Sequence, residues 1–130
     1  MVKQPRPTRH ESDPAAMAEP ELHRCPDPSR AVTTRAFQGI SSLACGPGGR
    51  RYAVWHGGPT PGEDRNNYVI LAVSEDGGAT WSERLIIDPD GPGPVRAYDP
   101  QVWSAPDGRI WVFWAQEAKG SRPKGRCGVW

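Results

Sequence analysis

The octapeptide from Ser74 to Trp81 constrains the fold of this chain more than any other stretch. It reads Ser-Glu-Asp-Gly-Gly-Ala-Thr-Trp and fits the pattern Ser-x-Asp-x-Gly-x-Thr-Trp. Asp and Thr side chains in a tight turn bond backbone groups that lack ladder partners, and glycines supply positive φ where the chain reverses. Trp81 offers a large apolar face for packing between sheets. The octapeptide therefore predicts a hydrogen-bonded turn between two strands.

Composition agrees with a protein built from short strands and turns. The 130 residues include 15 Gly, 15 Pro and 6 Trp, which is typical of an all-β chain. The formal net charge is +1, so no long-range field favours nucleic acid or an anionic membrane as a partner. The longest apolar run, Tyr68–Val73, is too short to cross a bilayer. We expect neither nucleic acid nor membrane as a partner.

The first 35 residues differ in character from the rest. Residues 1–35 mix proline with both signs of charge and have almost no periodic apolar positions, which predicts a disordered leader. They contain no apolar stretch suited to a secretory signal, so we expect a cytoplasmic protein. The three cysteines, Cys25, Cys45 and Cys127, lack metal-type spacing, which indicates free thiols and no metal site.

Hydrophobic patterns after residue 35 predict successive antiparallel hairpins. One four-stranded unit is expected from strands at 37–44, 51–56, 68–74 and 84–88, and strands at 98–104 and 109–115 open a second unit. Both 46–55 and 105–114 run from a Pro-x-Gly turn through Arg into an aromatic strand, an offset close to 60. Residues 36–130 therefore predict a partial β-propeller of about one and a half four-stranded blades.

A propeller of this size is incomplete. Propellers close with about four to eight blades of about 40–50 residues each. We expect an N-terminal fragment of a longer propeller; a truncated reading frame and a subunit that needs partners are the alternatives. Open blade edges predict self-association.

The octapeptide pattern is the Asp-box of sialidase-like β-propellers, also called the BNR repeat. The stretch from Phe37 to Trp130 resembles bacterial sialidase-family proteins in several further pieces, namely 37–40, 67–71, 96–100, 111–116 and 125–130. The resemblance implies a six-bladed propeller and a glycoside hydrolase that acts on a terminal sugar without a cofactor. In that family the box is structural and lies away from the catalytic centre, which assigns structural roles to Ser74, Asp76, Gly78, Thr80 and Trp81. The nucleophilic Tyr–Glu pair would lie beyond residue 130, so we expect this chain to be inactive alone.

The resemblance also indicates candidate site residues. The first of the three arginines that bind sialic acid in the family is replaced by Gln38, which lacks the charged fork that a carboxylate needs. Gln38 is then expected either to bind a neutral sugar hydroxyl or to satisfy strand ends near the axis. The family's general acid lies in the loop that here holds Glu63 and Asp64. Either could protonate a leaving oxygen, or both form a solvated acidic turn.

Further candidates follow from strand order in the blade. Arg96 and Asp99 precede an expected innermost strand. There they would contact substrate, with Asp99 as a catalytic residue. Alternatively, the two would form an ion pair that pins the loop between blades. Gln116 and Arg126 are substrate-binding candidates of the same type. His56 is expected to be a packed histidine, and the inter-blade core is expected to contain Trp55, Trp103, Trp111 and Trp114.

Two functions remain open at this point. The favoured hypothesis is the N-terminal part of a sialidase-superfamily glycoside hydrolase. The alternative is a non-catalytic Asp-box propeller that binds a glycan or a protein, because a fold does not fix a function. A third hypothesis is a decayed gene fragment with no folded product.

Overall fold

The computed structural model describes residues 15–118 and 127–130, and this part of the chain is all-β, as predicted. Its strands are β1 (Glu21–Arg24), β2 (Phe37–Cys45), β3 (Arg51–Gly58), β4 (Tyr68–Ser74), β5 (Ser82–Asp88), β6 (Val95–Ser104), β7 (Ile110–Ala118) and β8 (Cys127–Val129). Three short 3-10 helices accompany them: η1 (Pro28–Arg30), η2 (Val32–Thr34) and η3 (Pro47–Gly49). Within the described residues no helix has the length and apolar character needed to span a membrane.

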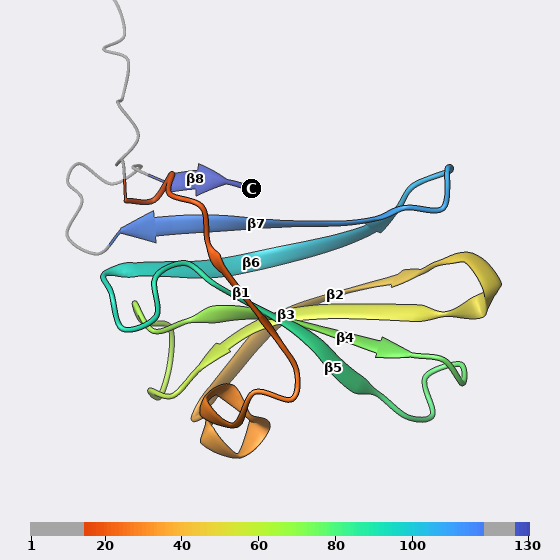
Figure 1. Cartoon of the computed structure of the whole chain (residues 1–130), viewed down its shortest axis with the longest axis horizontal. Helices are drawn as coiled ribbons and strands as arrows, with labels where there is room; N and C mark the ends of the chain where they lie inside the picture. The colour runs from red at the N-terminus through yellow and green to blue at the C-terminus, as the bar shows by residue number, and fades with distance from the viewer. Residues whose placement is uncertain (1–14, 119–126) are drawn as a thin grey trace, which may run out of the picture.

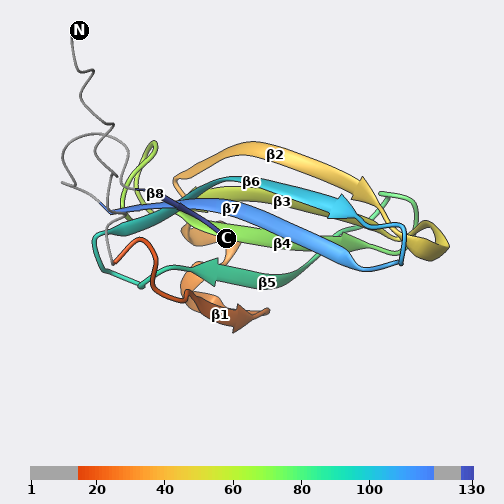
Figure 2. The same ribbon diagram turned by 90° about the horizontal axis from the view of Figure 1, so that it is seen from above.

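The strands form two antiparallel sheets that pack face to face (Figure 1). The first sheet has the order β1-β5-β4-β3-β2, and the second has the order β6-β7-β8. The predicted meander of four strands is confirmed as β2 to β5, each paired with the next along the chain. Viewed from above, β2 and β6 run side by side along one edge of the two sheets (Figure 2).

The N-terminal segment is ordered from residue 15 onward, so the prediction of a disordered leader is wrong for residues 15–35. β1 pairs with the outer strand β5, with Glu21 opposite Asp88. Asp27 caps η1 by accepting a hydrogen bond of 3.0 Å from the Ser29 amide. The charges that suggested a solvated leader are instead paired with carboxylates of the sheet. The remainder of the predicted leader, residues 1–14, lies outside the described residues.

β4 lies in the middle of the core and is buried on both faces, as predicted. Tyr68 and Ile70 point to one face, where they cluster with Ile86 and with the partly buried Cys25 of the N-terminal segment. On the opposite face Val69 contributes to a second cluster, which the second sheet covers; its other members are Ile87, Ala97, Leu85, Val112 and Trp114. The first sheet is therefore packed between the N-terminal segment and the second sheet.

The second hairpin repeats the backbone of the first. Both β2 and β6 carry a bulge, and each bulge holds a non-glycine residue at positive φ, Ile40 at 26° and Asp99 at 48°. These two residues are 59 positions apart, the same offset that separates the turns at 46–49 and 105–108. The sequence repeat is thus confirmed in the structure, down to the position of the bulge.

The octapeptide forms the predicted turn between β4 and β5. The Ser74 hydroxyl donates to Asp76 Oδ1 at 2.8 Å and accepts from the Gly78 amide at 2.8 Å. The Thr80 amide donates to the same Asp76 oxygen at 2.8 Å. Trp81, however, is 42% exposed, and its Nε1 donates back to the Gly78 carbonyl at 3.1 Å. The expectation that Trp81 packs between sheets is wrong, because its indole closes its own turn.

Replacing Asp76 with asparagine is expected to reduce the acid sensitivity of the fold. Hydrogen bonds from the Thr80 side chain and amide, and from Ser74, lower the pKa of Asp76 from 3.8 to about 2. A depressed folded-state pKa gives stability that is present above pH 3.8 and lost as the pH falls toward 2. Urea midpoints measured from pH 5 to pH 2 should fall more steeply for the parent than for Asp76→Asn. Parallel curves would contradict this assignment, and Glu75→Gln in the same turn is the matched control.

Candidate functional site

Ionisable side chains from four elements lie at one end of the two sheets. They come from the end of β3, from the β3–β4 loop at residues 59–67, from β6 and from the end of β7. We call this set the rim cluster, and its members are His56, Glu63, Arg96, Asp99 and Glu117. The antiparallel register explains part of the arrangement, because Arg96 lies directly opposite Glu117 on the β6–β7 ladder.

Arg96 ties the β3–β4 loop to the second sheet. Its Nη1 donates to Glu63 Oε2 at 2.9 Å, while Nε and Nη2 donate to Glu117 Oε2 at 3.2 and 3.0 Å. The guanidinium carbon lies 4.2 Å from the centre of the Tyr98 ring. Burial disfavours the charge, but the hydrogen bonds that Arg96 donates to both glutamates outweigh this effect and raise the pKa of Arg96. Arg96 thus pins the loop, with Glu63 and Glu117 rather than Asp99 as its partners.

His56, near the end of β3, is the buried member of this cluster. Its side chain is fully buried, and its ring lies 5.5 Å from the Phe37 ring, centre to centre. Its Nε2 is 3.7 Å from Glu63 Oε1, which is too long for a hydrogen bond. Burial lowers the pKa of His56, against the opposing charges of Glu63 and Asp99, so the imidazole is neutral at pH 7.

Unpaired buried polar atoms gather around the same loop. Among the described residues, buried atoms without a hydrogen-bond partner include both ring nitrogens of His56, Thr60 Oγ1 and Asn67 Nδ2. The rest of Asn67 is used, since Oδ1 accepts from the Asp64 amide at 2.8 Å and the carbonyl accepts from the Ala97 amide at 3.0 Å. A buried polar atom without a partner costs about 1–3 kcal/mol. These atoms therefore mark a place for water or a ligand hydroxyl.

Asp99 is an exposed member of the rim cluster, as is Glu63. It occupies the β6 bulge at a φ of 48°, a left-handed conformation that aspartate tolerates better than most residues. No hydrogen bond or ion pair connects its carboxylate to the part of the chain that the structure describes. Its negative charge opposes the effect of burial on the pKa of His56. Asp99 thus combines a constrained backbone with an available carboxylate.

The other predicted site residues do not join the rim cluster. Gln38 lies on the opposite face of the first sheet, where its Oε1 accepts from Trp55 Nε1 at 2.9 Å. Gln116 is fully buried, and its Nε2 donates to the carbonyl of Ala16 at 3.0 Å. Asp64 follows Glu63 in the loop, and Arg126 lies outside the described residues. Gln116 therefore holds the N-terminal segment in place.

The tryptophans expected in the core divide into two groups. Trp103 and Trp111 are 52% and 44% exposed, on the face of the second sheet that points away from the first. For these two the expectation of burial is wrong. Trp55 and Trp114 pack against the two core clusters.

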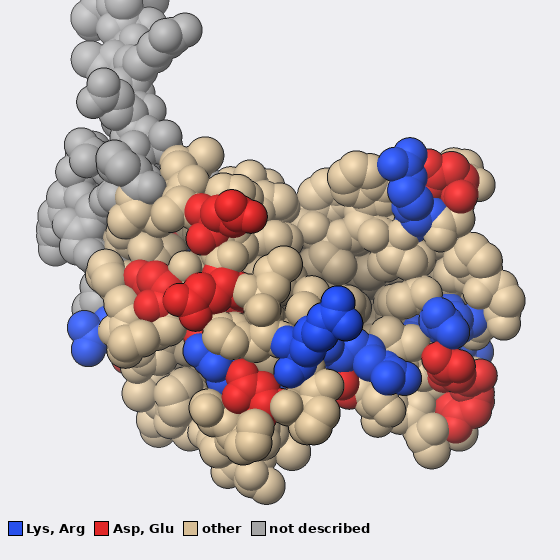
Figure 3. All heavy atoms as spheres, in the orientation of Figure 1, with Lys and Arg blue, Asp and Glu red and all other residues tan. Residues whose placement is uncertain are grey.

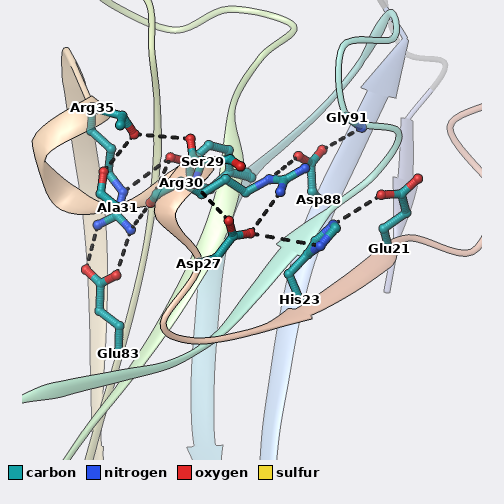
Figure 4. Close-up of polar contacts among 12 residues, drawn as sticks. Glu21, His23, Asp27, Ser29, Arg30, Ala31, Arg35, Glu83, Asp88 and Gly91 are labelled. Atoms are coloured by element: carbon teal, nitrogen blue, oxygen red, sulfur yellow. Dashed lines mark hydrogen bonds and ion pairs between the residues drawn. The ribbon is translucent and has the colours of Figure 1, made fainter.

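A second set of ion pairs, in the N-terminal segment, was not anticipated from the sequence (Figure 4). Arg30 donates to Asp27 and to Asp88, each at 2.9 Å. The Arg35 side chain is fully buried and donates to both oxygens of Glu83, at 2.6 and 2.7 Å. Acidic and basic side chains are interspersed on the face that carries this segment (Figure 3). These pairs hold residues 21–35 against the first sheet.

A groove of about 330 Å³ lies beside these pairs, lined by Cys25, Pro26, Asp27, Pro28, Ala31, Val32 and Glu83. Burial and the charge of Glu83 raise the pKa of the Cys25 thiol, which disfavours the reactive thiolate. Within residues 15–118 and 127–130, no three His, Cys, Asp or Glu side chains are grouped so as to bind a metal ion. The rim cluster is therefore the stronger candidate site.

Comparison with known proteins adds no family assignment. No protein-family model matches the chain, and no curated protein matches it.

Proposed function

We propose that residues 36–130 form part of a sialidase-like β-propeller that acts on a terminal sugar as a glycoside hydrolase. Two features of the fold support the proposal. The Ser74–Trp81 turn uses its Ser, Asp and Thr side chains as hydrogen-bonding groups, in the way that its pattern predicts. The two sheets stack face to face with the edge strands β2 and β6 alongside each other, as neighbouring blades would. The first sheet corresponds to one blade with β1 added at its outer edge.

The observation that carries the proposed activity is the pair of carboxylates beside a buried, neutral histidine. Glu63 comes from the β3–β4 loop and Asp99 from the β6 bulge, and both act on His56. Glycoside hydrolases use two carboxyl groups, one of which protonates the leaving oxygen. Glu63 is already paired with Arg96, whereas Asp99 is available. In this proposal Asp99 is the proton donor, and Glu63 positions the sugar.

The alternative is a non-catalytic propeller that binds a glycan. Its support is the ion pair itself, because Arg96 holds Glu63 and Glu117 as charged, hydrogen-bonded partners. A cluster organised in this way can bind hydroxyl groups without transferring a proton to a leaving group. The hydrolase and the glycan-binding propeller would use the same site, but only the hydrolase would turn over a substrate.

Replacing Asp99 with asparagine is expected to abolish hydrolysis without unfolding the protein. Loss of a general acid lowers the rate by about 10²–10⁴-fold. The assay is release of aryl aglycone from a panel of aryl glycosides, carried out with the longest form of the protein that the gene encodes. Asp107→Asn, in the exposed turn before β7, is the matched control because Asp107 bonds only Arg109 within the described chain.

Three results separate the readings. Turnover that falls at least a hundredfold in Asp99→Asn and persists in Asp107→Asn supports the hydrolase. Sugar binding by ligand-observed NMR without turnover supports the binding module. Absence of both binding and turnover in the folded parent overturns the proposal.

A further inference from the structure

We infer that the rim cluster takes a neutral or amino sugar and rejects sugars that carry a carboxylate. This inference rests on the proposed function, because it assigns the ligand class of the same site. It depends on three observations: the sign of the local charge, the occupation of Arg96, and the unpaired neutral groups beneath Glu63.

Among the described residues, the charge around the rim cluster is negative. The β3–β4 loop and the adjoining ends of β6 and β7 contain four carboxylates, Glu63, Asp64, Asp99 and Glu117, against two guanidinium groups, those of Arg65 and Arg96. His56 adds no charge because it is buried and neutral. An anionic sugar would enter against this excess, and like charges brought together cost binding free energy.

The cationic member of the rim cluster, Arg96, is already bonded to two carboxylates. Carboxylate recognition by arginine depends on a free edge of the guanidinium that can donate two parallel hydrogen bonds. In Arg96 the Nε–Nη2 edge is bonded to Glu117, and Nη1 is bonded to Glu63. Arg35, whose side chain is fully buried, bonds both oxygens of Glu83 on the opposite face of the first sheet.

The unpaired ring nitrogens of His56 can form hydrogen bonds with sugar hydroxyls. A neutral imidazole has one donor and one acceptor nitrogen, and a sugar hydroxyl can serve as the partner of either. Because His56 Nε2 and Glu63 Oε1 are 3.7 Å apart, one oxygen atom can lie about 2.8 Å from both. That oxygen would satisfy a buried nitrogen that lacks a partner in the described chain. The exposed Asp99 carboxylate can accept from a second hydroxyl or from the ammonium group of an amino sugar.

The test compares three methyl glycosides of the same ring size, a glucoside, a glucosaminide and a glucuronide, by ligand-observed NMR titration. The glucoside and the glucosaminide are expected to bind at least about tenfold more tightly than the glucuronide. His56→Phe, which keeps a ring of similar size but removes the nitrogens, should weaken glucoside binding about fivefold or more. Asp107→Asn should leave all three affinities unchanged.

Glu117→Gln provides the reciprocal test. It removes one carboxylate from Arg96, so glucuronide binding should strengthen about threefold or more relative to glucoside binding. If the glucuronide binds the parent as tightly as the glucoside, and Asp99→Asn alters that binding, the ligand-class inference is wrong while the sugar site stands. If none of the three glycosides binds the folded parent, both the inference and the sugar site are wrong.

Discussion

Glu83→Ala is expected to lower the free energy of unfolding by about 3 kcal/mol. The substitution removes both carboxylate oxygens that Arg35 bonds. This fully buried side chain then keeps only neutral acceptors within the described chain, namely the Arg30 carbonyl, the Tyr68 hydroxyl and Gln38 Oε1. Such a loss costs more than the ion pair contributes, because the remaining charge has been removed from water. We place the value at the low end of the range because Glu83 itself is 28% exposed.

The measurement is a urea unfolding series, with limited proteolysis as a second readout. Glu75→Ala is the matched control, since Glu75 forms only exposed ion pairs with Arg50 and Arg84, which contribute little. The Glu83 variant should also be cut faster between residues 15 and 35, because Arg35 anchors that segment. Equal midpoints for the Glu83 and Glu75 variants would show that this ion pair does not hold the segment in place.

Ile70→Ala is expected to cost about 3–4 kcal/mol of unfolding free energy. Ile70 is fully buried on the face of β4 that the N-terminal segment covers, in contact with Tyr68 and Ile86. The substitution removes apolar contacts and leaves a cavity that strands on a fixed ladder cannot close. Leu22→Ala on β1, where the side chain is 61% exposed, should cost far less. Similar urea midpoints for these two variants would mean that the N-terminal segment does not cover this face.

The predictable part of the fold is the part that local patterns specify. The apolar run of β4 indicated burial on both faces, and the structure confirms it. The octapeptide turn was predictable because all its hydrogen bonds lie within a few residues. The repeated Pro-x-Gly turns likewise located both hairpins, since a turn and the strands beside it form one local unit.

Features that depend on distant partners were not predictable. Arg30 and Arg35 bond carboxylates about fifty residues away, so their segment looked solvated until the sheet placed Asp88 and Glu83 beside it. Glu117 joins the rim cluster only because the β6–β7 register puts it opposite Arg96. The exposure of Trp111 depends on what lies against the outer face of the second sheet, which the pattern of its own strand does not reveal.

The position of β1 at the outer edge of the first sheet also has a consequence for folding kinetics. β2 to β5 pair through consecutive hairpins, whereas β1 pairs with β5 across more than sixty residues. Closing such a loop carries an entropic cost that is repaid only after the meander exists. We therefore expect β1, which is synthesised before the meander, to dock after the meander has formed. Until β1 and its segment dock, Tyr68, Ile70 and Ile86 present an apolar surface that a chaperone or another chain can reach.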